Sequence, residues 1–254
     1  MIILKIFAGC VIISLITLSV FFLLKAHQVN SGREKIDTLL EATTFPKLEN
    51  PGSVESLMIL PLIDFYTDRN GLETEPGVSY LIKADDTTIL MDVGFNQGKT
   101  HPSPLLNNMN ALKINIPDID MIFISHIHPD HVGGMSEAKK SEFSISQGSV
   151  EIGAVPVFSP EPLKPSKWNP GPVVEVVTEP KIITFGIATL GPIPRFLFLA
   201  GRTDEQVLAI NLKGKGIVLI VGCGHPTIER IIERTKMVFD QPIYAIIGGL
   251  HLIG

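Results

Sequence analysis

A run of metal-binding side chains directly after an apolar stretch constrains this chain more than any other feature. Residues 126–131 read His-Ile-His-Pro-Asp-His, which places three imidazoles and one carboxylate within six residues. The preceding residues 121–124, Met-Ile-Phe-Ile, are typical of a buried strand. Pro129 stiffens the turn that follows, and Gly133 and Gly134 permit backbone conformations closed to other residues. The pattern predicts a loop that leaves the carboxyl end of a strand and gathers its side chains around one point.

The types of these side chains predict a divalent metal centre. Neutral imidazole together with carboxylate suits zinc, with iron and manganese as alternatives. His126 and His128 can approach one ion, whereas Asp130 and His131 are offset and can hold a second. Two adjacent ions would clamp a substrate oxygen and lower the pKa of a bound water, which gives hydroxide near neutral pH. The alternative is a histidine-rich surface loop without an ion, but the strand and the glycines specify geometry as well as composition.

The motif and the segments around it resemble the metallo-β-lactamase superfamily. Three further segments occur in the order expected of that family: 89–94 (Ile-Leu-Met-Asp-Val-Gly), 222–226 (Gly-Cys-Gly-His-Pro) and 248–252 (Gly-Gly-Leu-His-Leu). The last two look like the later ligand segments of the branch that contains the archaeal dihydropterin ribofuranosylaminobenzene 5′-phosphate synthases. The resemblance extends from about residue 57 to the end. It implies an α/β (α+β) fold, a four-layer αββα sandwich with the metal site at one edge.

Two distant histidines complete the expected ligand set. His225 follows the apolar run 217–221, and we expect it to be the third ligand of the first ion, with helix capping or packing as the alternative. His251 follows the apolar run 244–247, and we expect it to complete the second site.

Two carboxylates are expected to take part in catalysis. Asp92 ends the strand-end motif, and we expect it to orient a ligand histidine through the other ring nitrogen, with a simple turn carboxylate as the alternative. We expect Asp130 both to bind the second ion and to orient the attacking hydroxide.

The chain departs from the family pattern at two places. Residues 201–204 read Gly-Arg-Thr-Asp where common superfamily hydrolases have Gly-His-Thr, and Cys223 stands near the expected bridging aspartate. Cys223 could reach the metal as a thiolate, but a small buried residue in a tight turn is the favoured interpretation. Arg202 could bind an anionic substrate group, or it could pair with Asp204 or Glu205.

The segment 156–172 contains six prolines and Trp168, the only tryptophan of the chain. Prolines fix the backbone and remove amide donors, so we expect a stiffened loop here and no regular element. One hypothesis is that this loop lies over the metal cleft and that Trp168 contacts substrate. The alternative is a surface loop held by one aromatic residue.

The amino terminus predicts a membrane segment. Residues 6–24 are continuously apolar, long enough to span roughly 30 Å of hydrocarbon as a helix. The stretch is longer than a usual signal-peptide core and no small-x-small cleavage site follows, so we expect an uncleaved single-pass anchor in preference to a removed leader. Lys5 precedes the stretch, whereas Lys25, Arg33 and Lys35 follow it, and the positive-inside tendency favours a cytoplasmic catalytic domain.

The remaining chain fits one globular domain. We expect an anchor over 1–30, a linker over 31–55 with a short helix near 34–42, and a catalytic domain over 56–254. The net charge of −5 and the lack of a basic run after the anchor argue against a nucleic-acid partner. Relatives in this branch continue beyond the position where this chain ends, three residues after His251, so we expect either a compact version or a fragment.

Hydrophobic periodicity gives a coarse map of the elements. It predicts helices near 103–112 and 226–238, and strands near 57–63, 78–83, 88–92, 121–125, 143–158, 173–177, 181–185, 195–200, 206–212, 216–221 and 243–247. Two groups of strands, each accompanied by helices, are consistent with two packed sheets.

These observations together predict a metal-dependent hydrolase that uses a metal-activated hydroxide on a small-molecule ester, lactone or phosphoester. Two alternatives remain open. The family name implies a synthase or transferase acting on a pterin or a phosphorylated sugar, and a noncatalytic metal-bearing sensor or binding module would carry the same ligands.

Overall fold

The computed structural model describes residues 2–250 of the 254-residue chain. The chain divides into two compact units. The first consists of Met1–Thr44 and Pro194–Thr203, and the second of Phe45–Ile193 and Asp204–Gly254.

The first unit is built on one long helix, α1 (Ile2–Ala42). It continues through the first part of the predicted linker, because residues 31–42 contain no proline and are rich in good helix formers. It ends before Thr43 and Thr44, where β-branched residues and the approach to Pro46 disfavour helical backbone. By length and composition α1 could cross a membrane, which fits both an anchor and a signal sequence.

The first unit also contains most of a β-hairpin. Its strands are β11 (Ile193–Leu197) and β12 (Gly201–Glu205), joined by a turn over residues 198–200. The periodicity predicts one strand over 195–200, but Gly201, with a φ of +76°, lies just after this turn and lets the chain reverse.

The described part of the second unit is built on two large sheets. The first has six strands in the order β1 (Leu57–Ile63), β2 (Ser79–Ala84), β3 (Thr87–Met91), β4 (Met121–Phe123), β6 (Pro156–Ser159) and β8 (Val173–Val176). Strands β1 to β3 pair antiparallel, and β3, β4, β6 and β8 pair parallel.

The second sheet has five strands in the order β15 (Ile243–Gly248), β14 (Gly216–Val221), β13 (Leu208–Leu212), β10 (Ile187–Thr189) and β9 (Lys181–Thr184). Helix α4 (Ile228–Val238) connects β14 to β15 along the chain, and these two strands pair parallel. The other pairs in this sheet are antiparallel. The remaining elements are α2 (Pro104–Ala111), η1 (Ile116–Asp118), α3 (Met135–Lys139), and the short pair β5 (Glu142–Phe143) and β7 (Lys164–Pro165).

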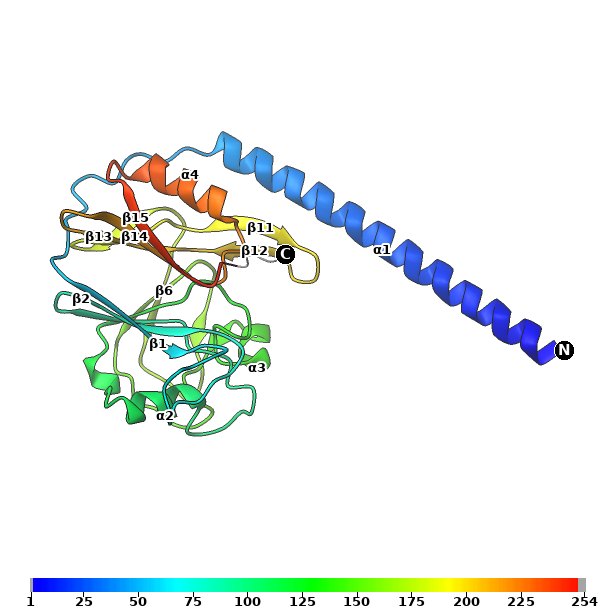
Figure 1. The fold of residues 1–254 in the computed structure, drawn as a ribbon, viewed down its shortest axis with the longest axis horizontal. Helices are drawn as coiled ribbons and strands as arrows, with labels where there is room; N and C mark the ends of the chain where they lie inside the picture. The colour runs from blue at the N-terminus through cyan, green and yellow to red at the C-terminus, as the bar shows by residue number, and fades with distance from the viewer. Residues whose placement is uncertain (1, 251–254) are drawn as a thin grey trace. The chain divides into compact units, whose positions relative to one another are not determined.

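Side-chain alternation in the strands creates two hydrophobic cores. Ile82 and Phe123 of the first sheet pack with Ile210 of the second in one cluster between the sheets. Neighbouring residues with the opposite orientation, such as Leu81 and Ile122, pack in a second cluster that includes residues of α2. Figure 1 shows α2 outside the first sheet and α4 outside the second, so the second unit is an α/β sandwich of the predicted αββα type.

The structure corrects the prediction that the proline-rich segment 156–172 contains no regular element. Residues Pro156–Ser159 form β6, which pairs with β4 on one side and β8 on the other. A proline is tolerated at the first position of a strand, and Val157 and Phe158 are buried on the two faces of the sheet. The predicted strand over 143–158 is accordingly two separate strands, β5 and β6.

The core between the sheets gives a direct test of the packing. Ile210→Ala removes a fully buried side chain of β13, and we expect the free energy of unfolding to fall by about 2–5 kcal/mol because a cavity remains. Met58→Ala on β1, where the side chain is 43% exposed, should change it by less than about 1 kcal/mol. Urea unfolding of both variants in one detergent measures the difference, and equal effects would contradict this packing.

Candidate metal centre

The predicted ligands that lie within residues 2–250 meet at one edge of the sandwich for a topological reason. Strands β3 and β4 are parallel neighbours, so Asp92 and the loop 125–131 leave the sheet at the same edge. The backbone N–H of Asp92 donates to the carbonyl of Phe123 at 2.9 Å, and the N–H of Val93 donates to the carbonyl of His131 at 3.0 Å. These bonds fix the motif loop against the end of β3.

Asp92 is fully buried and organises the motif loop. One carboxylate oxygen accepts the backbone N–H of Ser125 at 2.7 Å, and the other accepts the Ser125 hydroxyl at 2.7 Å. The second oxygen also lies 2.7 Å from Nδ1 of His131. A carboxylate bound to Nδ1 directs Nε2 of the same ring outward. The sequence predicts that Asp92 orients a ligand histidine, and its contact with His131 has the geometry for that role.

The tight turns in this loop depend on glycine, as the sequence indicates. Gly133 has a φ of +88°, and a Cβ built on it would overlap the carbonyl oxygen of Ser144. Its N–H donates to the carbonyl of Gly94 at 2.9 Å. Any larger residue would therefore displace the loop from its neighbours.

A second buried carboxylate, that of Glu205, holds the loop after β14. Its oxygens accept the backbone N–H groups of Cys223, Gly224 and His225 at 2.9, 2.9 and 2.8 Å. Burial raises the pKa of the Glu205 carboxyl, although these three N–H groups and nearby His131 favour its ionised form. Glu205 thus positions both side chains that this loop offers to a metal.

Within the part of the chain that the structure describes, two groups of donor atoms converge at the edge of the sandwich. His126, Cys223 and His225 form one group, and Asp130, His131 and Cys223 form the other; within each group all ligand atoms lie within 4.8 Å of one another. Imidazole nitrogen, thiolate sulfur and carboxylate oxygen are the donors that zinc and related divalent ions prefer. The residues therefore fit a His/Cys metal site, and Cys223 belongs to both groups.

His128 lies beside the first group. Its Nδ1 is 3.1 Å from Nε2 of His225, and its ring centroid lies 4.5 Å from that of His126. The rings of His126 and His225 have centroids 4.9 Å apart. The three imidazoles predicted to share one ion are thus brought together from two loops about 100 residues apart in the sequence.

Cys223 and His131 are in direct contact, with Sγ 3.0 Å from Nε2. Burial raises the pKa of the Cys223 thiol, although His131 counteracts this. Burial alone would lower the pKa of His131, but Asp92 and Cys223 outweigh burial and raise it well above the ordinary value. The favoured sequence interpretation of Cys223, a small buried residue in a tight turn, does not describe this contact.

A cleft of about 310 Å³ opens onto the second donor group. Asp130, His131 and Cys223 line one side, and the other lining residues are Asp64, Phe65, Gly77, Val78, Tyr80, Gly222, Gly248 and Gly249. Burial, together with Asp64 and Asp92, raises the pKa of the Tyr80 phenol, which keeps its hydroxyl protonated. The cleft therefore combines the candidate metal ligands with a neutral hydrogen-bond donor.

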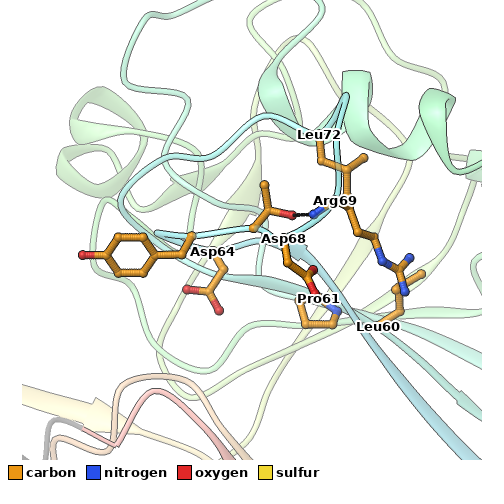
Figure 2. A pocket seen from close by; sticks show the side chains of 8 residues that line it. Leu60, Pro61, Asp64, Asp68, Arg69 and Leu72 are labelled. Carbon is orange, nitrogen blue, oxygen red and sulfur yellow. Dashed lines mark hydrogen bonds between the residues drawn. The ribbon is translucent and has the colours of Figure 1, made fainter.

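A second pocket, of about 430 Å³, lies in the loop after β1 and shares Asp64 with the cleft. Figure 2 shows the side chains of Asp64 and Arg69 extending to different sides of this pocket. The backbone N–H of Arg69 donates to Oγ1 of Thr67 at 3.1 Å, the dashed line of Figure 2. Because both are lined by Asp64, this pocket lies next to the cleft. Its lining includes the carboxylates of Asp64 and Asp68 and the guanidinium of Arg69.

The other predicted site residues have different outcomes. His251 lies outside the described residues. Arg202 is exposed on β12 and belongs to the first unit, whereas the donor groups belong to the second. Trp168 is partly buried under the ammonium group of Lys167, 4.4 Å from its ring centroid. Among the described residues, those that line the cleft do not include Trp168. The substrate-binding roles of Arg202 and Trp168 stay predictions.

Three residues of the site are not singled out by the sequence pattern. It indicates Glu205 only as a partner of Arg202, Tyr80 as a strand residue and Ser125 as the end of a strand. The sequence does contain one signal for Glu205. In β12 buried and less buried residues alternate, and Glu205 occupies a buried position. A carboxylate at such a position must be hydrogen-bonded, because burying it without partners is costly. Nothing in the sequence around Tyr80 distinguishes it from an ordinary core residue.

Comparisons with known proteins agree with this geometry. The family model described as "Metallo-beta-lactamase superfamily" matches residues 72–227. A 7,8-dihydropterin-6-methyl-4-(beta-D-ribofuranosyl)-aminobenzene-5'-phosphate synthase from Methanocaldococcus jannaschii is 29% identical over 242 residues, 81% of each chain. The crystal structure of Tm1679, described as a metal-dependent hydrolase of the beta-lactamase superfamily, matches with a TM-score of 0.51 and 24% identity over 78% of each chain. A quorum-quenching N-acyl homoserine lactone lactonase matches at 17% identity with a TM-score of 0.47, over 78% of this chain and 92% of that one.

The family match includes both Asp92 and the motif loop, and it ends just after His225. The sandwich, the loops at its edge and the converging donors agree with it. The chain therefore belongs to the metallo-β-lactamase superfamily.

Proposed function

We propose that this metallo-β-lactamase-fold enzyme is a hydrolase of a small-molecule ester, lactone or phosphoester. The observation that carries the proposal is the pair of donor groups that share Cys223, one of which opens directly onto a cleft of about 310 Å³. A site that only stores or senses a metal has no need of such a cleft, whereas a hydrolase needs room for a substrate beside the ligands.

A bound divalent ion would supply Lewis acidity and a lowered pKa for water, with zinc the first candidate and iron or manganese the alternatives. The roles of the chain's own residues follow from their positions. Asp130 is placed to accept a proton from an attacking water, because its side chain is 34% exposed and one oxygen lies 3.6 Å from Nε2 of His131. Asp92 holds the His131 ring in the orientation that presents Nε2 to the site.

Tyr80 is placed to stabilise developing charge. Its hydroxyl belongs to a residue that lines the same cleft as the donor group, and its raised pKa keeps the proton on the oxygen. A neutral hydroxyl can donate a hydrogen bond to an oxygen that becomes negative in the transition state.

A synthase or transferase acting on a pterin or phosphosugar is the second candidate. The observation that favours it is the 29% identity to the M. jannaschii synthase, which extends over 81% of both chains. The same ligands and cleft would serve such a reaction, since this scaffold hosts several chemistries.

We also propose that α1 remains attached as a single-pass membrane anchor. Its residues carry no charge from Val11 to Leu24, the large apolar ones among them are exposed, and the helix then continues without a break to Ala42. The sequence after the apolar stretch also lacks the small-x-small pattern at which a signal peptide is cleaved. The side of the membrane on which the enzymatic unit lies is expected from the positive-inside tendency to be the cytoplasm.

The hydrolase proposal predicts the behaviour of two histidine variants. The full chain in detergent, loaded with zinc, should hydrolyse at least one member of a panel of chromogenic esters, lactones and phosphoesters. His126→Ala and His128→Ala should each lose bound zinc, measured by elemental analysis, and lower kcat/KM by at least about a hundredfold. Activity and metal content that remain at the level of the unmodified enzyme would refute the assignment.

The same preparations separate the second candidate. Incubation with a dihydropterin that carries a diphosphate leaving group on its 6-methyl carbon, and with a phosphorylated ribosyl aminobenzene, followed by mass spectrometry, detects the condensation product and the released diphosphate. A product here, together with no turnover of the hydrolysis panel, would replace the hydrolase by the synthase.

The shared position of Cys223 predicts a spectroscopic signature. Because its sulfur belongs to both donor groups, cobalt(II) bound in place of the native ion should show a sulfur-to-cobalt charge-transfer band in the near ultraviolet. Cys223→Ser should abolish this band. Cys10→Ser, at the other cysteine, is the matched control and should retain it. A band of unchanged intensity in Cys223→Ser would show that the thiolate does not bind the ion.

The pKa values of His131 and Cys223 predict proton release on metal binding. Both pKa values are raised, so both groups carry a proton near neutral pH that must leave when they become ligands. Zinc affinity should therefore fall as the pH is lowered. Zinc titration calorimetry of the metal-free full chain in buffers of different ionisation enthalpy measures the released protons. Cys223→Ser should release about one proton fewer than the unmodified chain. An observed enthalpy that is independent of the buffer would contradict this assignment.

A further inference from the structure

The hairpin β11–β12 packs on α1 although the two are far apart in the sequence. The Nε–H of Arg33 donates to the carbonyl of Phe196 at 3.2 Å, across 163 residues of chain. Arg195 and Asp37 extend the contact, with Nη1 and Oδ1 4.0 Å apart. All four residues belong to the first unit, so the contact is part of one compact body.

Gly32 makes this close approach feasible. A Cβ built on Gly32 would lie 2.5 Å from the ring atoms of Phe196, a distance that real Cβ atoms do not adopt. Gly32 lies on one stripe of the helix with Val29 and Ile36, both of which are buried, since residues three and four apart share a helix face. A glycine in the interior of a helix costs stability, and here it is explained by the aromatic ring that rests on it.

The hairpin also reaches the apolar part of α1. The ring of Phe198, in the turn of the hairpin, stacks on the ring of Phe22 with centroids 6.2 Å apart and an interplanar angle of 18°. Phe22 lies near the end of the continuous apolar stretch that closes at Leu24, and it is 50% exposed. The turn of the hairpin is therefore level with the end of the predicted membrane span.

The next residue of the turn, Leu199, has an 88% exposed side chain. Leu197 to Ala200 form an apolar tip, and basic side chains flank it: Lys25 follows the apolar stretch of α1, and Arg195 and Arg33 lie at the base of the hairpin contact. An apolar tip below a belt of cations matches the order of acyl chains and head groups at a membrane surface.

We propose that the hairpin tip, residues 197–200, inserts into the interface of the lipid bilayer that holds α1. The occupant of this exposed apolar surface is lipid, because the tip lies beside the one helix of the described chain that is apolar enough to cross a membrane. The inference rests on the anchoring proposed above. It gives the enzyme a second membrane contact about 170 residues from the first in sequence.

Single-tryptophan fluorescence of the full chain in lipid nanodiscs tests this contact. Trp168→Phe removes the only native tryptophan, and Leu199→Trp then reports on the tip. Two reference variants carry the same background. Ile16→Trp lies within the apolar stretch, and Leu39→Trp replaces a 48% exposed residue of α1 that follows the basic residues Lys25 and Arg33. Because the side chains of Leu199, Ile16 and Leu39 are exposed, we expect the fold to tolerate tryptophan at these positions.

Nanodiscs of phosphatidylcholine and phosphatidylglycerol with brominated acyl chains quench a tryptophan that reaches them. We expect the Leu199→Trp variant to lose emission to lipid brominated near the head group and to be blue-shifted, whereas the Leu39→Trp variant keeps its emission. The Ile16→Trp variant should be quenched by lipid brominated deeper in the chain.

The outcomes separate the two proposals. If the Ile16→Trp variant is quenched while the Leu199→Trp variant behaves like the Leu39→Trp variant, the hairpin contact is overturned and the anchor stays in place. That result would mean that the tip faces water or a protein instead of lipid. Absence of quenching in both the Ile16→Trp and the Leu199→Trp variants overturns the anchor and, with it, the inference drawn from it.

Discussion

The site depends above all on the hydrogen bonds between the buried Asp92 carboxylate and the motif loop, residues 125–131. The carboxylate binds the backbone and hydroxyl of Ser125 and the Nδ1 of His131, each at 2.7 Å. Burying a carboxylate without such partners would cost several kcal/mol of folding free energy. The buried position of Asp92 therefore depends on its three hydrogen bonds. The strand order makes these hydrogen bonds feasible, because β3 and β4 are parallel neighbours and end at the same edge of the sheet.

Glu205 performs the corresponding task for the loop after β14, through three backbone N–H groups. The two carboxylates thus act on the two loops that supply the donor atoms. Two buried acidic groups beside the His and Cys donor atoms also favour a cation at this edge electrostatically. The geometry of the candidate metal centre therefore depends on the buried carboxylates of Asp92 and Glu205 as much as on the histidines that predict it.

The hydrophobic periodicity of the sequence predicted many of the helices and strands. The apolar runs at 57–63 and 216–221 coincide with β1 and β14, and the amphipathic pattern at 226–238 agrees with α4 to within two residues. Periodicity failed where an element is too short to establish a period, as in β10, or where composition points the other way, as in β6. In β6 the pairing with strands on both sides outweighs the local preference of a proline-rich segment. Such pairing is decided by distant parts of the chain.

The sequence by itself determined that a strand-end loop carries His126, His128, Asp130 and His131, since spacing and flanking residues are local properties. It also indicated that Asp92 orients a ligand and that an apolar helix leads the chain. Only the tertiary structure placed Cys223 within reach of both donor groups, turned Glu205 toward the loop after β14, put Tyr80 in the cleft and laid Phe198 on Phe22. Each of these contacts joins segments that are far apart in the chain. Their approach depends on strand register and loop path, which no short window of sequence encodes.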